Sequence, residues 1–406
     1  MRPVIRRCGG RGLARMNIIA DRLKNIPPYL FMELRDRIKQ MEACGTDFVS
    51  LAVGDPVEPT PVYIIECLRR AALDPSNHQY PTDEQRGMHA FRAAVARWYK
   101  RKYGVHLDPE DEVLGLSGSK EGIHNLLMAV VNPGEVVMVT DPGYPGYLAN
   151  IPIVGGKPYP IPLLAKNGYL PDLDDIPESI CRRAKVFFFN YPHNPTGACA
   201  TPEFFTRLVA WAKAHRIFLV HDNPYSEIVL PGGEKLSLLQ VPGAKEICVE
   251  FNSLSKTYNM TGWRIGMAAG NPAIIQAMST FKENVTSGIF NAIQLASIKA
   301  LDDGDEDIEK MIRIYAGRRA MALAEIRKWG IDIDTHVGKG TFYLWLPVPN
   351  GMTSIEFTTR LLDKAHVLVT AGSAFGKNGE GFFRMSLTVP DDRLACALER
   401  MRRSLD

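Results

Sequence analysis

Short apolar segments alternate with segments of helical periodicity along residues 113–270, and this alternation constrains the fold more than any other feature of the chain. Strands that alternate with helices form a largely parallel sheet with helices on both faces, and ligand-binding groups gather where the strands end. We therefore predict an α/β fold whose large domain has three layers, α/β/α, around a mostly parallel sheet. The expected strands are residues 113–116, 136–140, 185–190, 217–221, 247–251 and 265–269.

The chain has 406 residues, which is too long for one small core, so we expect two domains. Apolar strand-like segments after residue 339, with helices between them, predict a smaller α+β C-terminal domain. Residues 1–20 carry five arginines and no acidic residue. We interpret them as a disordered basic tail, or as a translation start placed upstream of Met16, in preference to an organelle-targeting peptide. The predicted organisation is a tail at 1–20, an N-terminal arm at 21–47 that packs on the small domain, the large domain at 48–290 and the small domain at 291–406.

Composition excludes several functional classes. Lys and Arg number 48 against 45 Asp and Glu, and the resulting net charge of +3 offers no nucleic-acid footprint. No apolar run reaches the roughly 20 residues that a membrane-spanning helix needs. The seven cysteines are scattered without a CxxC pair, which indicates a reducing compartment and no zinc site. We therefore expect a cytoplasmic protein that binds neither nucleic acid, nor membrane, nor metal.

The segment from Ser253 to Arg264 places one lysine among hydroxyl side chains just after an expected strand. A lysine that attacks a carbonyl must lose its proton near neutral pH, which requires a buried or cationic setting. Lys256 has Ser253 and Ser255 beside it, and Arg264 lies further along the same segment. Hydroxyls and cations suit a phosphate next to an imine-forming amine, a combination that describes pyridoxal 5'-phosphate. The alternative is an ordinary surface lysine in a polar loop.

A second phosphate-binding element is expected at Ser119 and Lys120, which follow Gly118 after a strand and open an apolar helix. Small residues at a helix N-terminus expose free N–H groups and the positive end of the helix dipole, and both attract a phosphate. A well-capped helix with a surface lysine explains this pattern equally well.

Three further strand ends carry groups that suit the ring of this cofactor. Asp222 can pair with a protonated pyridine nitrogen, and Tyr225 can hydrogen-bond the phenolate oxygen. Tyr144, in a turn rich in proline and glycine, can lie flat on a planar ring. Asn194, flanked by prolines, presents an amide to the phenolate oxygen or to a substrate carboxylate. Each residue also has a common structural explanation, as a turn residue or as a core tyrosine.

Arg384 stands inside an otherwise apolar strand-like segment. An arginine is rarely left unpaired in such a segment, and its planar fork suits a substrate carboxylate. Each purely structural explanation is plausible alone. To explain the whole pattern, however, every one of them must be true at the same time, at successive strand ends. That coincidence is improbable, so the pattern predicts one shared site.

These motifs resemble those of the fold-type I, class I and II aminotransferases over nearly the whole chain after residue 17. Within that superfamily, the chain is most similar to the LL-diaminopimelate aminotransferases and to the related alanine and aspartate transaminases. The resemblance is carried by the motifs Gly118-Ser-Lys-Glu-Gly-Ile, Asp141-Pro-Gly-Tyr-Pro, Asn194-Pro-Thr-Gly, Ser253-Leu-Ser-Lys-Thr-Tyr-Asn-Met-Thr-Gly-Trp-Arg-Ile-Gly and Phe383-Arg-Met-Ser-Leu-Thr-Val-Pro.

The resemblance implies a homodimer with shared active sites that moves an α-amino group from an amino acid to a 2-oxo acid, here 2-oxoglutarate, by a ping-pong mechanism. It implies that Lys256 forms the Schiff base with pyridoxal 5'-phosphate and moves the proton, and that Asp222 and Tyr225 assist catalysis. The implied cofactor contacts are Tyr80 from the second subunit, Ser119, Lys120, Tyr144, Asn194, Asp222, Tyr225, Ser253, Ser255, Lys256 and Arg264. The implied substrate contacts are Tyr29, Gly54, Lys120, Tyr144, Asn194, Asn291 and Arg384.

The side chain of the substrate is less firmly predicted. The best match is LL-diaminopimelate, an amino acid of lysine biosynthesis, because Tyr29 and the pair Asn291 and Gln294 match positions of that group. Alanine and aspartate are the alternatives. The loop with Asp83 and Glu84 is longer and more charged than is usual in the family, and His193 stands where asparagine or serine is more usual.

Two other functional classes compete with a transaminase. A carbon–sulfur lyase, a decarboxylase or an oxidase would use the same cofactor shell with a different control of the substrate. A ligand-binding regulator would need a DNA-binding domain, and the residues before the expected sheet are too few and lack a helix-turn-helix pattern.

Overall fold

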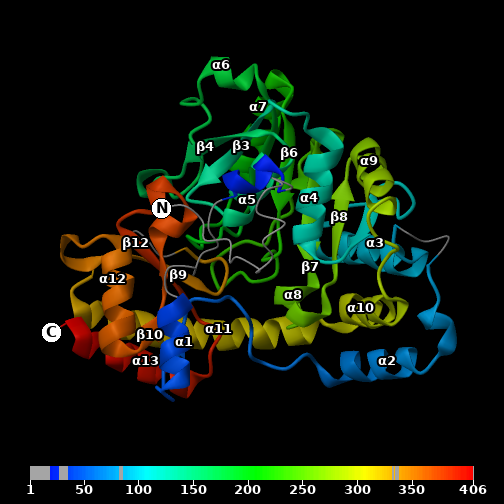
Figure 1. Cartoon of the computed structure of the whole chain (residues 1–406). Helices are drawn as coiled ribbons and strands as arrows, with labels where there is room; N and C mark the ends of the chain where they lie inside the picture. Colours follow the sequence, from blue (N-terminus) through cyan, green and yellow to red (C-terminus); the bar gives the residue numbers. More distant parts are fainter. Residues whose placement is uncertain (1–18, 27–34, 82–85, 332, 334–337, 406) are drawn as a thin grey trace, which may run out of the picture.

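The computed structural model describes residues 19–26, 35–81, 86–331, 333 and 338–405 (Figure 1). The predictions for Tyr29, Asp83, Glu84 and most of the basic tail fall outside these residues. No helix in the described part of the chain is both long and apolar enough to cross a membrane.

In the described residues, the largest sheet has seven strands in the order β2-β8-β7-β6-β5-β3-β4. Strand β8 runs antiparallel to both of its neighbours, and the other pairings are parallel. This arrangement confirms the predicted α/β fold with a mostly parallel sheet. The strands are β2 (Val113–Leu116), β3 (Val136–Asp141), β4 (Lys157–Pro162), β5 (Ala184–Phe189), β6 (Phe218–Asp222), β7 (Cys248–Ser253) and β8 (Gly266–Gly270).

Helices cover both faces of this sheet, which gives the three predicted layers (Figure 1). Buried aliphatic and aromatic side chains alternate between the faces along the strands other than β4, so each of these six strands contributes to two cores. One face is covered by α4 (Ser119–Val130), α5 (Pro145–Ile153) and α9 (Pro272–Glu283), and the other by α2 (Val62–Ala72), α3 (His89–Tyr103), α7 (Pro202–His215) and α10 (Asn291–Asp303).

Strand β4 is absent from the strands expected on sequence. It lies at the edge of the sheet, where it pairs with β3, and most of its residues are exposed. Pro158, Pro160 and Pro162 alternate along it. Proline lacks the N–H that a central strand needs and is therefore confined to edges. An exposed, proline-rich strand has no apolar run, which is the signal that identified the other six.

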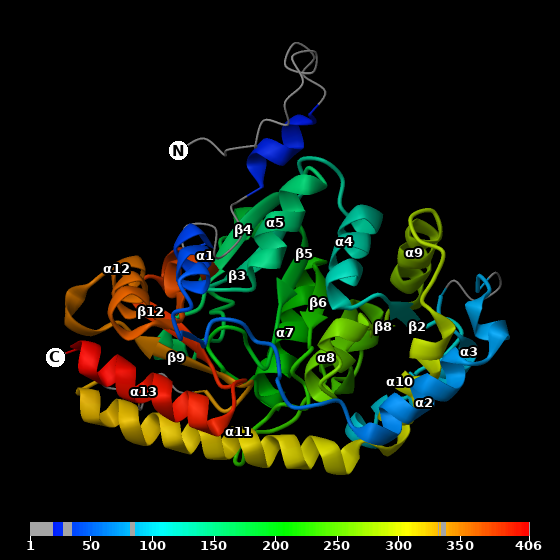
Figure 2. The ribbon, with the colours of Figure 1, turned by 60° about the horizontal axis from the view of Figure 1, so that its bottom comes forward.

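A second core lies beside the sheet and is built mainly from the C-terminal third of the chain (Figure 2). It contains the antiparallel sheet β11-β12-β9, and α13 packs along α11 beneath that sheet. A short parallel pair, β1 with β10, joins the first residues of the predicted large domain to this second core. The elements are β1 (Val49–Ser50), β9 (Tyr343–Pro347), β10 (Val367–Leu368), β11 (Thr370–Ala371), β12 (Phe382–Ser386), α11 (Asp305–Ile326), α12 (Ser354–Arg360) and α13 (Asp391–Leu405).

Helix α10 belongs structurally with the large sheet, although the predicted boundary at 290/291 assigns it to the small domain. It packs on α2 and α3, and its Ala296 and Ala300 are part of the first core. Along α11, Ile308 belongs to the first core, whereas Met311 and Tyr315 belong to the second. Near the N-terminus, α1 (Arg35–Ala43) lies beside Leu362 and Leu368 of the small domain.

Candidate active site

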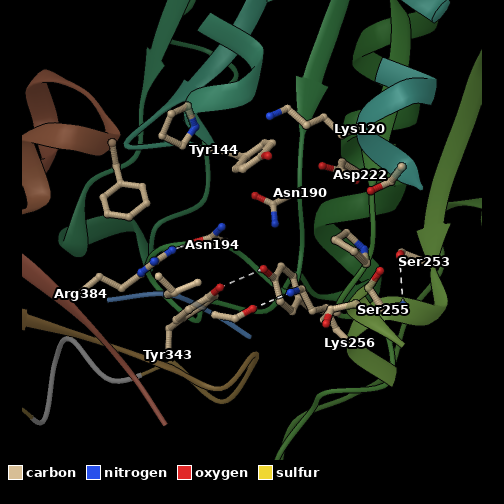
Figure 3. A pocket seen from close by; sticks show the side chains of 18 of the residues that line it. Lys120, Tyr144, Asn190, Asn194, Asp222, Ser253, Ser255, Lys256, Tyr343 and Arg384 are labelled. Carbon is tan, nitrogen blue, oxygen red and sulfur yellow. Dashed lines mark hydrogen bonds between the residues drawn. The ribbon is translucent and has the colours of Figure 1, made fainter. Parts of the chain in front are cut away.

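A cavity of about 350 Å³ opens where the parallel strands end and the second core meets the large sheet (Figure 3). It gathers most of the residues that the sequence predicted for one shared site. The predicted residues that line it are Gly54, Ser119, Lys120, Tyr144, Asn194, Asp222, Tyr225, Ser253, Ser255, Lys256, Arg264 and Arg384.

Lys256 lies on α8 (Leu254–Thr257), the single helical turn that follows β7. The Ser253 hydroxyl caps this turn by accepting a hydrogen bond from the Ser255 N–H at 3.2 Å. The Lys256 ammonium donates to the carbonyl oxygen of Gly54. Burial lowers the pKa of Lys256 to about 8, with the charges of Arg264 and Arg384 acting in the same direction and that of Asp55 opposing them. The amine can therefore be neutral near physiological pH, as a nucleophile or base requires.

One end of the cavity is shaped for an anion. Gly118, with φ of 86°, turns the chain from β2 into the N-terminus of α4, where Ser119 lines the cavity. A Cβ on Gly118 would collide with the guanidinium of Arg264, so glycine is required for this close approach. Free N–H groups at the start of α4, two serine hydroxyls and the Arg264 cation converge there. These groups fit the phosphate of pyridoxal 5'-phosphate.

Asp222 is the last residue of β6 and lines the floor of the cavity, and one of its carboxylate oxygens has no hydrogen-bond partner among the described residues. Its Oδ2 accepts a hydrogen bond from the Tyr147 hydroxyl at 2.7 Å, whereas its Oδ1 is buried without a partner among the described residues. Burial raises the pKa of Asp222 to about 6, opposed by the Tyr147 hydrogen bond and by the charge of His221. A protonated pyridine nitrogen would satisfy the orphaned oxygen, so this end fits the cofactor ring.

Tyr147 was not among the predicted site residues. It stands on α5, three residues after Tyr144, and its ring meets that of Tyr144 edge to face at 5.4 Å. The segment that suggested Tyr144 also contains Tyr147. The signal that could have identified Tyr147 in the sequence is therefore its position three residues after Tyr144.

Tyr225 lies beside a second unpredicted residue, Tyr343 of β9. Their hydroxyls are 3.2 Å apart, and burial raises the pKa of Tyr225 well above its ordinary value, so that it remains a neutral donor. A Cβ on Gly54 would collide with the hydroxyl of Tyr343, which explains why glycine occupies that position. Nothing in the apolar segment around Tyr343 distinguished it from a core tyrosine.

Arg384 projects from β12 and is buried between aromatic rings. Its guanidinium lies 4.0 Å from the ring centre of Tyr343 and 4.7 Å from that of Phe375, which sequence reasoning also missed. It donates to Asn194 Oδ1 at 2.8 Å and to the carbonyl of Ala52. Its Nε is buried without a partner among the described residues. A planar cation that is held flat and still has donor capacity suits a carboxylate.

Three predicted contacts lie away from this cavity. Tyr80 is 77% exposed and borders a separate hollow with Phe290. Asn291 does not line the cavity. Gln294 is buried, accepts from the Met88 N–H at 2.7 Å and donates to the Ile289 carbonyl at 2.8 Å.

His193 is buried and does not line the cavity. Its Nδ1 lies 2.8 Å from the Thr196 hydroxyl. Burial lowers the pKa of His193 to about 3, so the ring is neutral. It supports the loop that presents Asn194.

Among the described residues, one group of side chains has the geometry of a metal site. It consists of Glu178, Cys181 and His215, outside the cavity. Glu178 already pairs with Arg182 at 3.2 Å, and the Cys181 thiol contacts the carbonyl of Ile176. The cavity itself presents an amine, amides, hydroxyls and arginines, a donor set that suits an organic anion.

Comparison with known proteins agrees with a cavity that binds an organic anion. The family model described as "Aminotransferase class I and II" matches residues 46–401. The LL-diaminopimelate aminotransferase of Aquifex aeolicus is 48% identical over 383 residues, which cover 94% of this chain and 98% of that protein.

Solved structures share the architecture over almost the full length. Substrate-bound BacF from Bacillus subtilis matches with a TM-score of 0.90 and 39% identity, covering 96% of this chain and 98% of the other. A single mutant of Thermus thermophilus aspartate aminotransferase matches with a TM-score of 0.89 and 28% identity, covering 96% of this chain and 100% of the other.

Proposed function

The chain belongs to the family of class I and II aminotransferases, and from that premise we propose that it moves the α-amino group of LL-diaminopimelate to 2-oxoglutarate. The chain is a transaminase that depends on pyridoxal 5'-phosphate, as the family does. The observation that carries the proposal is the convergence of Lys256, Asp222 and Arg384 on one cavity. The choice of donor rests on relatives that carry the name LL-diaminopimelate aminotransferase at 46–48% identity.

The residues around the cofactor have separate tasks. Bound pyridoxal 5'-phosphate supplies an electron sink for the bonds at the substrate Cα. Asp222 would hold the ring nitrogen, and Tyr144 would cover a ring face. Tyr225 and Asn194 would donate to the phenolate oxygen. Ser119, Lys120, Ser253, Ser255 and Arg264 would hold the phosphate.

Lys256 performs the chemistry that needs a titratable group. Its lowered pKa of about 8 leaves a useful fraction of neutral amine at neutral pH, so it can carry the covalent link to the cofactor. Once the amino acid has taken its place, the neutral amine of Lys256 would accept the proton from the substrate Cα as an ammonium group and deliver it to C4' of the cofactor. The second half of the ping-pong cycle repeats these steps in reverse with the oxo acid.

Arg384 binds the α-carboxylate of both substrates. Its guanidinium is held by Asn194 and the Ala52 carbonyl, and the rings of Tyr343 and Phe375 flank it. This fixed orientation lowers the entropy lost on binding and aims Cα at Lys256.

We further propose that two chains share their active sites. Tyr80 is exposed and lies outside the cavity of its own chain, so it can extend to the phosphate of a partner. Val57, Val62, Val285 and Phe290 are large apolar side chains that are also exposed. Light scattering should give the mass of two chains, and the mass of one chain would contradict this assembly.

An amino-donor panel tests the proposed substrate. The purified holoenzyme is incubated with 2-oxoglutarate and LL-diaminopimelate, alanine or aspartate, and glutamate is measured. We expect the highest kcat/KM with LL-diaminopimelate. A higher value with alanine or aspartate would replace the donor and retain the reaction. Release of ammonia when no oxo-acid acceptor is supplied would instead identify a lyase or an oxidase.

A further inference from the structure

His221 and Glu250 face each other in the middle of the large sheet, outside the cavity. They are register partners on β6 and β7, and both side chains are fully buried. His221 Nδ1 lies 2.8 Å from Glu250 Oε2, and its Nε2 lies 2.9 Å from the carbonyl oxygen of Tyr191. Cross-strand partners share a face of a sheet, so this pair follows from the register.

Both ring nitrogens of His221 therefore face hydrogen-bond acceptors. A backbone carbonyl can only accept, so Nε2 carries a proton. The carboxylate at Nδ1 requires a second proton there if Glu250 is ionised. The Phe189 ring stacks on the imidazole at 5.1 Å with an interplanar angle of 16°, a contact that favours a cationic ring.

The surroundings of Glu250 indicate that it is ionised. Its oxygens accept from the Leu238 N–H at 3.0 Å, the Tyr99 hydroxyl at 3.0 Å and the Ser237 hydroxyl at 2.9 Å. Several donors on one carboxyl group favour the carboxylate, which accepts at every site. His221 is the partner that can balance this charge.

The other titratable groups around the pair remain neutral or are balanced elsewhere. Burial, followed by the charge of Glu250, raises the pKa of Tyr99 on α3 and of Cys248 on β7 well above their ordinary values. Further along α3, Tyr103 donates to Glu227. Glu227 is itself paired with Lys102 at 3.2 Å and with Lys235 at 3.0 Å.

We propose that His221 and Glu250 form a buried ion pair whose imidazolium keeps the neighbouring Asp222 ionised, which makes His221 a positioning residue for the cofactor. The reason is electrostatic. Asp222 must be an anion to hold a protonated ring nitrogen, yet burial opposes its ionisation. A cation one residue away on β6 offsets part of that cost. This role rests on the proposed use of Asp222 at the cofactor ring.

Nitrogen-15 NMR of the histidine rings in the cofactor-free protein at pH 8 tests the charge directly. Exposed imidazoles are neutral at that pH. We expect one ring with two protonated nitrogens, assigned to His221 by its loss in His221→Asn. A His221 ring with one bare nitrogen would overturn the ion pair. Because no cofactor or substrate is present, this result is independent of whether the proposed reaction occurs.

A matched pair of variants tests the consequence for the cofactor. Glu250→Gln removes the negative charge and keeps the shape of the side chain. We expect this variant to lose the proton on His221 Nδ1 and to bind pyridoxal 5'-phosphate about ten-fold more weakly. A ten-fold change corresponds to a change of one unit in the pKa of Asp222. Tyr99→Phe removes a neutral donor from the same carboxylate and should leave both ring protons in place. Wild-type affinity in Glu250→Gln, with Nδ1 deprotonated, would overturn the positioning role. If Glu250→Gln does not fold, His221→Gln takes its place in the affinity measurement, with the same ten-fold loss expected and wild-type affinity again contradictory.

Discussion

The half of the cavity that we propose for the cofactor is assembled from the ends of neighbouring strands in one sheet, whereas the half that we propose for the substrate carboxylate is assembled where two cores meet. Asp222 is the last residue of β6, and Lys256 lies in the helical turn that follows the adjacent strand β7. Arg384, Tyr343 and Phe375 instead come from the C-terminal part of the chain. The residues proposed for the cofactor and those proposed for the substrate α-carboxylate therefore come from separate parts of the chain.

The two halves are joined by direct hydrogen bonds between the cores. The Gly143 N–H donates to the Phe375 carbonyl at 2.9 Å, next to Tyr144 on the cofactor side. Asn378 donates to Asp141 Oδ2 at 2.8 Å. These bonds fix the C-terminal segment that carries Phe375 against the turn that carries Tyr144.

The largest effect is expected on the cofactor side. Lys256→Ala should lower kcat by more than about 10³-fold, because both the covalent anchor and the proton carrier are lost. The absorbance of the covalently bound cofactor should also disappear. Added methylamine should restore part of the proton transfer if the protein is folded. Turnover at the wild-type rate would remove Lys256 from the mechanism.

A substrate-side substitution should leave the cofactor undisturbed. Arg384→Lys keeps the charge and loses the planar fork, so KM for the amino donor should rise about ten- to one-hundred-fold. The cofactor absorbance and the affinity for pyridoxal 5'-phosphate should remain those of the wild type. Loss of the cofactor in this variant would show that the two halves are not separable.

The pKa of Lys256 gives the cofactor side a pH signature. A neutral amine attacks the aldehyde, so the rate of covalent reconstitution of the cofactor-free protein should rise about ten-fold per pH unit and level off above pH of about 8. The sign follows from burial, which disfavours the ammonium form. Nα-acetyl-lysine in solution is the control, with an inflection near its ordinary pKa of about 10.4. The same inflection in the protein would contradict the lowered pKa.

The smallest effect is expected where the two halves touch. Tyr343→Phe removes the hydroxyl that lies 3.2 Å from that of Tyr225, and kcat/KM should fall about three- to ten-fold. Tyr315→Phe is the matched control, because the Tyr315 hydroxyl is buried without a partner among the described residues. It should leave kcat/KM unchanged. Equal effects of the two substitutions on kcat/KM would show that the Tyr343 hydroxyl makes no specific contribution to the site.

Most of the residues that line the sheet side of the cavity could be predicted from the sequence, because strand ends carry local signals. A polar residue after an apolar run, as at Asp222, or a glycine before a helix, as at Gly118, is visible without any knowledge of packing. Tyr343 packs in the second core and Phe375 in the first, where an aromatic residue is ordinarily a core residue. Their contact with Arg384 depends on the pairing of β12 with β9 and β11, which brings together segments that are separate in the sequence. Strand β4 was missed for a related reason. Its alternating prolines interrupt the apolar pattern that identifies a strand in the sequence, and its extended conformation depends on pairing with β3.

We propose that the Lys256 amine forms the covalent link to the cofactor. Borohydride reduction of the holoenzyme fixes the cofactor on the lysine that carries it, and digestion with mass spectrometry locates the modified residue. We predict a single modified peptide that contains Lys256. Modification of Lys120, which lines the same cavity, or the absence of any modified peptide, would contradict the account.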